Sequence, residues 1–476
     1  MINELLSLII FNVIIITFYL FSFFSISKRL NFIAILITTI LWGLIPWPYF
    51  YLESEIQSVL MISFTRILIS AIFGFIIIII FITINKFKNK DPRFSWFVYN
   101  FQDLKNNLKD QVPTNGDLIK KKKRKWKFGY PLYYFLLGSC YFLSIFFYFL
   151  SYQYLGVIFS SIINTVVVMC IVAIWNLIRK TESFDTLKFS YLLILLVSGV
   201  LTILSRPLEI TATLPGFISL SLTIIFWFLF IVFSGFDKYT KREKKRVMII
   251  KEENNNFQMM KSIVKVSFFF LFALITMFLF ITILTVIPLP DNFIKQEIEL
   301  FYIELFNLGS VFQNPWTWII GIECTIMPYF IYFLSQNNWP PKSLKFDQWV
   351  SILAIFEPLA AIFVGLFIGN ETGYNLLLLS SSMMLMIVAM ILRYYHEKNS
   401  LRSFTLIRTN QKELEDLIQR LKYNSNVIEI KTITGEYDIA IRTFFQSYYK
   451  LKEFLDELKQ MKSVIEVENH IEFTKK

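Results

Sequence analysis

The sequence predicts an α-helical polytopic membrane protein that carries a small α+β domain at its C-terminal end. Of its 476 residues, 55% are hydrophobic, 18% aromatic and only 17% charged, a composition typical of membrane proteins. Apolar stretches long enough to cross a bilayer recur along the chain, and the basic residues gather between them. After about residue 395 these stretches end, and short strand-like and helix-like patterns replace them.

The apolar stretches predict eleven membrane spans, since each supplies the roughly 20 apolar residues that a crossing helix needs. The first lacks a basic start and a small-residue cleavage site, so we expect a retained anchor rather than a signal peptide. The expected spans cover about residues 3–24, 31–50, 59–84, 130–150, 155–178, 187–205, 214–234, 263–287, 315–335, 347–368 and 374–393.

The basic residues in alternate connections predict the orientation. One set of connections includes the basic runs at 86–127 and 238–265, whereas the opposite set holds only Arg206 and Lys295. Because basic connections stay in the cytoplasm, we place the N-terminus outside and everything after Arg393 in the cytoplasm of a cell-membrane protein. The net charge of +12 lies in these connections, so the expected partner is the lipid bilayer and not nucleic acid.

Two long connections have features of their own. The 85–128 loop carries a basic cluster at Lys120–Lys127, which either attracts anionic lipid or acts only as a topology determinant. The 288–314 connection has the pattern of an amphipathic helix lying on the membrane surface.

The ten spans after the first fall into two groups of five with similar sequence features. We expect four parts: an extra N-terminal span (1–30), two groups of five spans (31–205 and 206–395) and a tail domain (396–476). An odd number of spans in each group makes the two groups inverted repeats, which enclose a substrate site near the middle of the membrane. The shared features are Trp42-Gly43 and Glu182 in the first group, and Gly216, Trp227 and Glu371 in the second.

Five stretches of the two groups point to a known family. They are ILWGLIPWPYF, FTRILISAIFG, LSYQYLGVIFSSIINT, LLILLVSGVLTIL and LAIFEPLAAIFVGLFIGNE. The first four resemble the first half of an EamA-type transporter of the drug/metabolite transporter superfamily. The fifth resembles the second-half signature of that family, a glutamate-proline helix that ends in Gly-x-Glu. The resemblance covers about 31–393 and implies ten spans, so the 3–24 span departs from the family pattern.

The tail predicts a ferredoxin-like domain with the order βαββαβ. The expected strands are 403–408, 427–434, 437–444 and 464–473, and the expected helices are 412–422 and 448–461. The two middle strands meet at Gly435-Glu436, which is a hairpin signal. About 73 residues fold alone only marginally, so we expect a homodimer through this domain.

The tail also resembles a family. Its T-G-x-Y-D hairpin with Gly435, Tyr437 and Asp438, and its closing strand start at Val464–Val467, resemble the effector-binding domain of Lrp/AsnC-type regulators. The resemblance implies effector binding near Gly435, Tyr437 and Asp438, with amino acids as effectors. Gly and Asp are also ordinary turn residues, so a purely structural role is the alternative. No helix-turn-helix precedes this domain, so DNA binding is not implied.

Three charged residues within spans are candidates for substrate binding. Glu357, next to Pro358, and Glu323 are the acids well inside spans, where an ionisable group normally faces protein or water. Either carboxylate can take up a proton, or it can form a structural hydrogen bond. Arg66 can bind a carboxylate or phosphate in a bidentate manner, or its side chain can snorkel to the interface.

Polar and aromatic residues complete the candidate site. Asn164 is a mid-span amide that either joins two helices or lines the cavity. The aromatic candidates are also explained by ordinary packing or by an interfacial belt. They are Trp42, Trp227 and Tyr329, together with Tyr148 and Tyr152.

The sequence favours a transporter over an enzyme. It contains no phosphate loop, nucleophile elbow or metal-ligand spacing, and so we expect no enzymatic activity, no metal and no cofactor. The leading hypothesis is a secondary transporter, an exporter or exchanger of small metabolites such as amino acids, regulated by the tail. The alternatives are a non-transporting membrane receptor on a transporter fold and, third, a lipid or sugar-carrier flippase.

Overall fold

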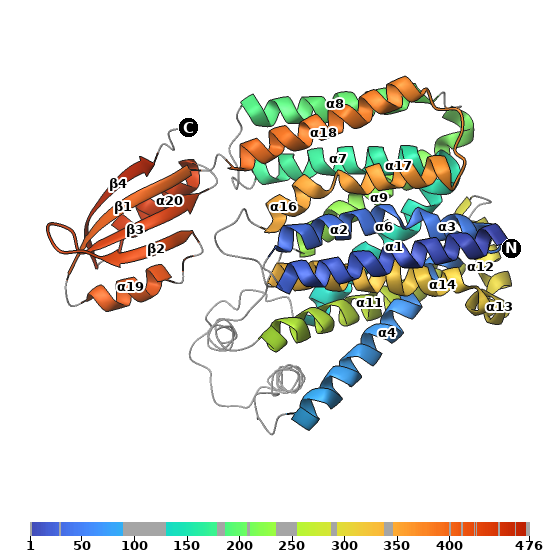
Figure 1. The fold of residues 1–476 in the computed structure, drawn as a ribbon, viewed down its shortest axis with the longest axis horizontal. Helices are drawn as coiled ribbons and strands as arrows, with labels where there is room; N and C mark the ends of the chain where they lie inside the picture. The colour runs from blue at the N-terminus through green and yellow to red at the C-terminus, as the bar shows by residue number, and fades with distance from the viewer. Residues whose placement is uncertain are drawn as a thin grey trace.

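The apolar stretches fold into helices, and the polar tail folds into a separate α+β domain (Figure 1). The computed structural model describes residues 2–27, 30–88, 130–178, 186–206, 210–234, 255–286, 293–337, 346–398, 401–410, 413–422, 424, 426–445, 448–461 and 463–472. The basic cluster of the 85–128 loop, Glu182 and most of the 238–265 run lie outside the described residues.

The helices before the tail occupy the following ranges. They are α1 (Ile2–Ser27), α2 (Asn31–Gly43), α3 (Pro46–Glu53), α4 (Val59–Lys88), α6 (Tyr130–Leu155), α7 (Val157–Ile178), α8 (Thr186–Ser205), α9 (Ile210–Ser234), α11 (Asn255–Val286), α12 (Phe293–Phe306), α13 (Leu308–Gln313), α14 (Pro315–Trp318), the π-helix η2 (Ile319–Ile326), α15 (Met327–Asn337), α16 (Phe346–Leu353), α17 (Phe356–Phe367) and α18 (Leu376–Lys398).

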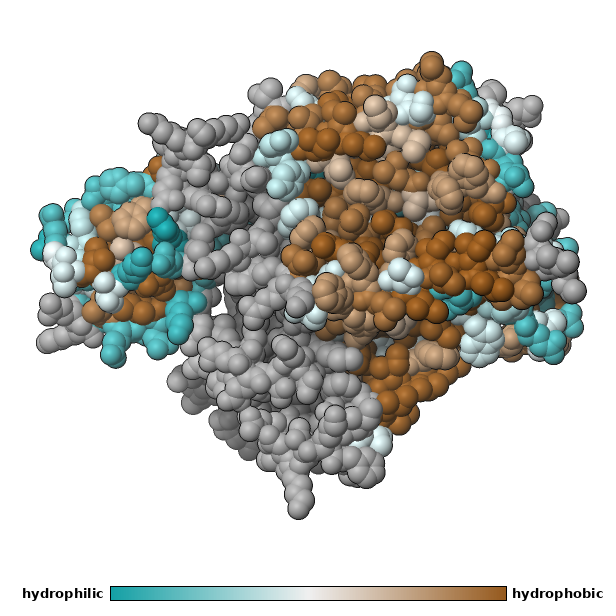
Figure 2. All heavy atoms as spheres, in the orientation of Figure 1, coloured by the Kyte–Doolittle hydropathy of each residue, from teal (hydrophilic) through white to brown (hydrophobic). Residues whose placement is uncertain are grey.

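Eleven helical segments of the described residues are long and apolar enough to cross a membrane. Large apolar side chains are exposed along many of them, and Figure 2 shows a broad hydrophobic surface over the bundle and a mostly hydrophilic tail. This is the surface of a multi-pass membrane protein, because apolar side chains face lipid at no cost.

Prolines break two of the expected spans. Pro48 and Pro358 carry no backbone N–H, so the carbonyls of Leu44 and Ala354 cannot accept the α-helical hydrogen bond from four residues later. They accept instead from the amides of Trp47 and Glu357, three residues later. The helix is interrupted at those positions, which separates α2 from α3 and α16 from α17. A third expected span, 315–335, contains the π-helix η2.

The contacts between helices match when the two groups of five are exchanged. In the first group α2 contacts α15 and α17, and in the second group α9 contacts α6 and α7. Likewise α4 contacts η2 as α11 contacts α6, while α4 pairs with α11, α7 with α17, and α8 with α18. The extra helix α1 lies against α2 and α15.

The tail is a four-stranded antiparallel sheet with the order β2-β3-β1-β4, and two helices pack on it. Its core holds apolar residues of both helices and of the strands, among them Ile407, Ile441 and Phe454. The elements are β1 (Leu401–Thr409), α19 (Leu414–Lys422), β2 (Val427–Thr432), β3 (Ile439–Phe445), α20 (Tyr448–Lys459) and β4 (Val464–Glu472). Their order agrees with the predicted ferredoxin-like domain. In Figure 1 the tail lies beyond one end of the bundle, and the N-terminus lies at the opposite end, which we call the far end.

Candidate binding site

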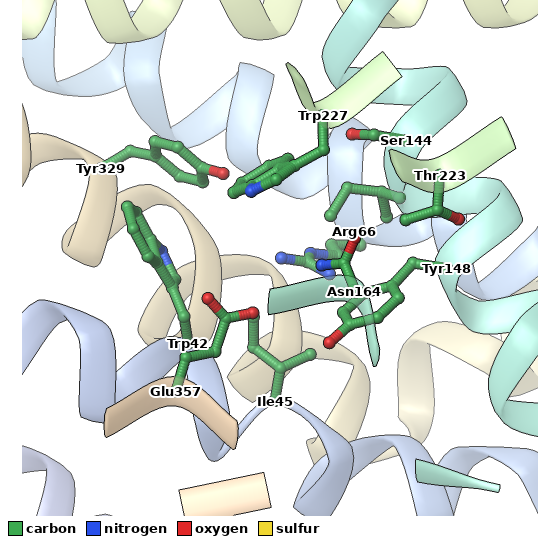
Figure 3. A pocket seen from close by; sticks show the side chains of 11 residues that line it. Trp42, Ile45, Arg66, Ser144, Tyr148, Asn164, Thr223, Trp227, Tyr329 and Glu357 are labelled. Carbon is green, nitrogen blue, oxygen red and sulfur yellow. The ribbon is translucent and has the colours of Figure 1, made fainter. Parts of the chain in front are cut away.

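A cavity lies inside the bundle, where helices of both groups meet (Figure 3). Its wall is mostly apolar and carries a few polar and charged side chains. Six of the seven candidate site residues line it, and Glu323 does not. The lining residues come from α2, α4, α6 and α7 of the first group and α9, α15 and α17 of the second, with Ile45 at the break after α2. They are Trp42, Ile45, Arg66, Ser144, Ile145, Tyr148, Asn164, Thr223, Trp227, Tyr329 and Glu357.

Arg66 enters the cavity from α4 and is almost completely buried, with 1% of its surface exposed. Its Nε donates a hydrogen bond of 2.6 Å to Oγ1 of Thr325 on η2, and its guanidinium lies 5.3 Å from the ring centroid of Phe149. Its Nη1 and Nη2 have no hydrogen-bond partner among the described residues. A guanidinium enclosed by protein in this way does not snorkel to the membrane interface.

Glu357 enters the cavity from α17, one residue before Pro358. Figure 3 shows its carboxylate directed into the space that the Arg66 guanidinium also faces. The α2 helix passes close behind it: a Cβ atom on Gly43 would contact the backbone carbonyl of Glu357 and lie 2.7 Å from the Cβ of Ala360. Gly43 is therefore the residue that lets the two broken spans cross at the cavity.

Aromatic rings form much of the cavity wall. The ring centroid of Trp42 is 5.1 Å from that of Tyr329 and 6.3 Å from that of Trp227. On another wall Tyr148 donates a hydrogen bond of 3.1 Å to Ser161, so its hydroxyl is already engaged. The cavity volume open to the centres of water-sized molecules is about 20 Å³, enough for a water molecule and too small for a metabolite. In this structure the cavity therefore has no room for a metabolite.

Glu323 lies on another side of η2. Its backbone carbonyl accepts a hydrogen bond from the Tyr19 hydroxyl on α1, and its Oε2 is buried without a hydrogen-bond partner among the described residues. Thr325, two residues later, faces Arg66 instead. Residues two positions apart on a helix point in different directions, so η2 cannot direct both Thr325 and Glu323 toward Arg66.

Four lining residues carry no signal in the sequence. Ser144 and Thr223 supply hydroxyls, and Ile45 and Ile145 supply apolar wall. Such residue types are common in every span, so only the fold distinguishes those that face the cavity.

At the far end, glutamates of the second group meet the N-termini of first-group helices. Glu304 accepts a hydrogen bond of 2.6 Å from the amide of Gln57, and Glu297 accepts one of 3.3 Å from the amide of Leu60, at the start of α4. An acid at a helix N-terminus interacts favourably with the helix dipole. Burial nevertheless raises the pKa of Glu297 to about 7, although hydrogen bonds to the carboxylate oppose the shift.

The start of α7 has a similar arrangement. Glu371 accepts hydrogen bonds from the amides of Val157 and Ile158, and burial raises its pKa against the effect of these bonds and of the nearby Arg206. The chain turns there at Gly156, whose φ of 83° suits glycine. The two helices that carry Arg66 and Asn164 are therefore both held at their far ends by the other group of five.

The candidate effector residues lie in the turn between β2 and β3. Gly435 has a φ of 136°, which explains the glycine, and nothing lies within 4 Å of the position of a Cβ there. The Asp438 carboxylate accepts a hydrogen bond of 2.8 Å from the amide of Thr409, so it also stabilises the turn. The Glu468 carboxylate beside the Tyr437 hydroxyl raises the pKa of that hydroxyl to about 12.

Comparison with known families assigns the tail. Residues 402–474 match the family model of the Lrp/AsnC ligand binding domain. The comparison with curated proteins gives no match. The chain therefore joins a bundle of membrane-type helices to an Lrp/AsnC ligand-binding domain, as the resemblance of the tail implied.

Proposed function

We propose that the protein is a secondary transporter of the EamA type, which moves a small metabolite such as an amino acid by alternating access and is regulated by a ligand on its tail. The observation that carries the proposal is the cavity, in which Arg66 from one group of five and Glu357 from the other face one closed space. An ionisable pair inside a membrane bundle is costly, and it marks a path for a substrate or an ion.

The matched contacts of the two groups support the inverted-repeat architecture. A site between inverted repeats becomes accessible from each side in turn when one repeat rocks against the other. The broken spans α2–α3 and α16–α17 cross at this site through Gly43 and Glu357, so movement of either span changes the cavity.

The tail supports the regulatory half of the proposal. An Lrp/AsnC ligand-binding domain directly follows the last span, with two residues between α18 and β1. A bound effector biases transport only when its affinity differs between the two access states. We place effector binding near Gly435, Tyr437 and Asp438, and the tail on the cytoplasmic side because of the basic connections.

Flux in proteoliposomes tests both halves. Full-length protein and a variant that ends after Lys398 are assayed for uptake and exchange across a panel of amino acids. We expect flux from both proteins and a dependence on internal amino acid only with the tail. If the flux of the full-length protein does not depend on any amino acid tested, regulation by the tail is contradicted. If neither protein gives flux, transport itself is contradicted.

Glu357→Gln separates a transporter from a receptor that moves nothing. A transporter loses flux or the pH dependence of its flux, whereas a receptor changes only its response to the ligand. Glu299→Gln, on the exposed face of α12, is the matched control.

A further inference from the structure

We infer that the cavity binds an α-amino acid with a large, uncharged apolar side chain, holding its carboxylate on Arg66 and its ammonium group on Glu357. The inference rests on the proposed transport function and names the substrate class of the same site.

The charges of the lining define the charges of the ligand. Among the residues that line the cavity, Arg66 is the one cation and Glu357 the one acid. A ligand with one negative and one positive group compensates both, whereas a ligand of net charge leaves one buried charge uncompensated. A charged side chain on the ligand would likewise find no third partner, which excludes the acidic and basic amino acids.

Arg66 presents the geometry that a carboxylate needs. Thr325 accepts a hydrogen bond from its Nε, which orients the guanidinium, and the Tyr141 hydroxyl lies close enough to interact with the charge. Nη1 and Nη2 are buried and have no hydrogen-bond partner in the described part of the chain. Two parallel N–H groups match the two oxygens of one carboxylate, and leaving such donors buried without a partner is costly. The same observation shows that Glu357 does not already bond to these two nitrogens.

Glu357 is placed for the ammonium group. It extends from α17, whereas Arg66 extends from α4, and Figure 3 shows the two heads facing the same space. An acid and a guanidinium that share a space without bonding each other can hold the two ends of a zwitterion. The aromatic wall of Trp42, Trp227 and Tyr329, together with Ile45 and Ile145, then surrounds the side chain.

The aromatic wall also provides the measurement. The cavity of about 20 Å³ must widen for such a ligand, which separates the rings of Trp42 and Trp227 and changes their fluorescence. All ten tryptophans precede residue 350, so a ligand on the tail has no tryptophan beside it in the tail domain.

The test titrates full-length protein in detergent with three probes while following tryptophan fluorescence. The probes are L-phenylalanine, 3-phenylpropionate, which lacks the ammonium group, and phenethylamine, which lacks the carboxylate. We expect L-phenylalanine to bind at least about tenfold more tightly than either analogue, because each analogue leaves one buried charge without a partner.

Two variants test which residue binds the carboxylate of the ligand and which binds its ammonium group. Arg66→Gln should abolish the preference for L-phenylalanine over phenethylamine and keep the preference over 3-phenylpropionate. Glu357→Gln should abolish the preference over 3-phenylpropionate and keep the preference over phenethylamine. Glu323→Gln changes a buried acid that does not line the cavity, so it should keep both preferences. Melting curves and gel filtration verify that each variant is folded.

The outcomes separate this inference from the proposed function. Equal affinity for all three probes, or preferences unchanged in both variants, overturns the inference even when the proteoliposomes transport another compound. Selective binding of L-phenylalanine without flux overturns the transport function and leaves the ligand class in place.

Discussion

Thr325 is the residue that positions Arg66 in the cavity. Its Oγ1 accepts the hydrogen bond from Arg66 Nε and donates one to the carbonyl of Ile320 within η2. Thr325→Val keeps the size and removes the acceptor. We expect substrate affinity to fall about tenfold, because hydrogen bonds to charged groups contribute about 1.5–3 kcal/mol. Binding of L-phenylalanine to both proteins measures the loss.

The matched control is Thr282→Val, since Thr282 is exposed and its hydroxyl bonds to the carbonyl of Phe278 on its own helix. A fall of the same size in the control would show that the effect does not pass through Arg66.

Glu297 makes the stability of the far end depend on pH. Its pKa in the folded protein is about 7, above the ordinary value of 4.5, so folding favours the protonated form. The folded state is therefore most favoured below about pH 4.5 and loses stability as the pH rises through 7, by up to about 3 kcal/mol. Glu304, whose pKa burial also raises, contributes in the same direction.

Glu297→Gln should flatten this pH dependence. We expect the apparent melting temperature of the wild type in detergent to fall between pH 5 and 8 and that of the variant to fall less, because Glu304 and Glu371, whose pKa values burial also raises, keep part of the dependence. Glu299→Gln serves as the control on the exposed face of the same helix. A pH slope in Glu297→Gln as steep as that of the wild type would contradict the assignment.

At the scale of elements, the crossing of α2 and α17 depends on Gly43. An added Cβ there meets the carbonyl of Glu357 and the side chain of Ala360, and backbone cannot move aside cheaply. We expect Gly43→Ala to destabilise the protein by about 1–3 kcal/mol and to abolish flux. Gly309→Ala is the control, because nothing lies within 4 Å of its Cβ position. Flux equal to wild type in Gly43→Ala would show that the crossing is looser than described.

The sequence predicted the elements better than their interruptions. Runs of apolar residues reveal helices, and the alternation in the tail revealed the strands to within a few residues. A proline signals a break, but the break itself falls at the carbonyl four residues earlier, as at Ala354 before Pro358. The π-helix has no comparable signal in IIGIECTI, and so the sequence pattern suggests Glu323 as a cavity residue and does not single out Thr325.

At the scale of the whole molecule, the tail has one uncovered sheet face. Ile407 and Ile441 of the sheet pack in the core with the two helices, so Phe404 and Leu406, at alternate positions of β1, lie on the other face. A second copy of the chain would cover these apolar residues, which fits the expected homodimer.

Leu406→Glu tests this pairing. We expect the full-length protein to be a dimer in detergent and the variant to be a monomer by light scattering, because the new charge would be buried between two sheets. Glu457→Lys, on the exposed side of α20, should leave the dimer intact. A wild-type protein that is monomeric at every concentration would contradict the prediction.

The whole bundle shows why the site was only partly predictable. Charged residues within spans are rare, so Arg66 and Glu357 stand out individually in the sequence. The hydroxyls of Ser144 and Thr223 resemble many others, and only the packing of α6 against α9 brings them to one cavity.

The π-helical turn of η2 contains one more residue than an α-helical turn, because its hydrogen bonds join residues five apart and not four. Two neighbouring helices hold it in that state: Ser70 on α4 donates to the carbonyl of Gly321, and Tyr19 on α1 donates to the carbonyl of Glu323. If both of these hydrogen bonds break, the one-residue insertion can move to another position along the helix. Thr325 would then rotate by about 100° about the helix axis, away from Arg66. Faster hydrogen exchange at the Thr325 amide in a Tyr19→Phe, Ser70→Ala double variant would register that rewinding. Arg66 would then release a bound carboxylate because η2 changes its helical pitch, without any helix tilting.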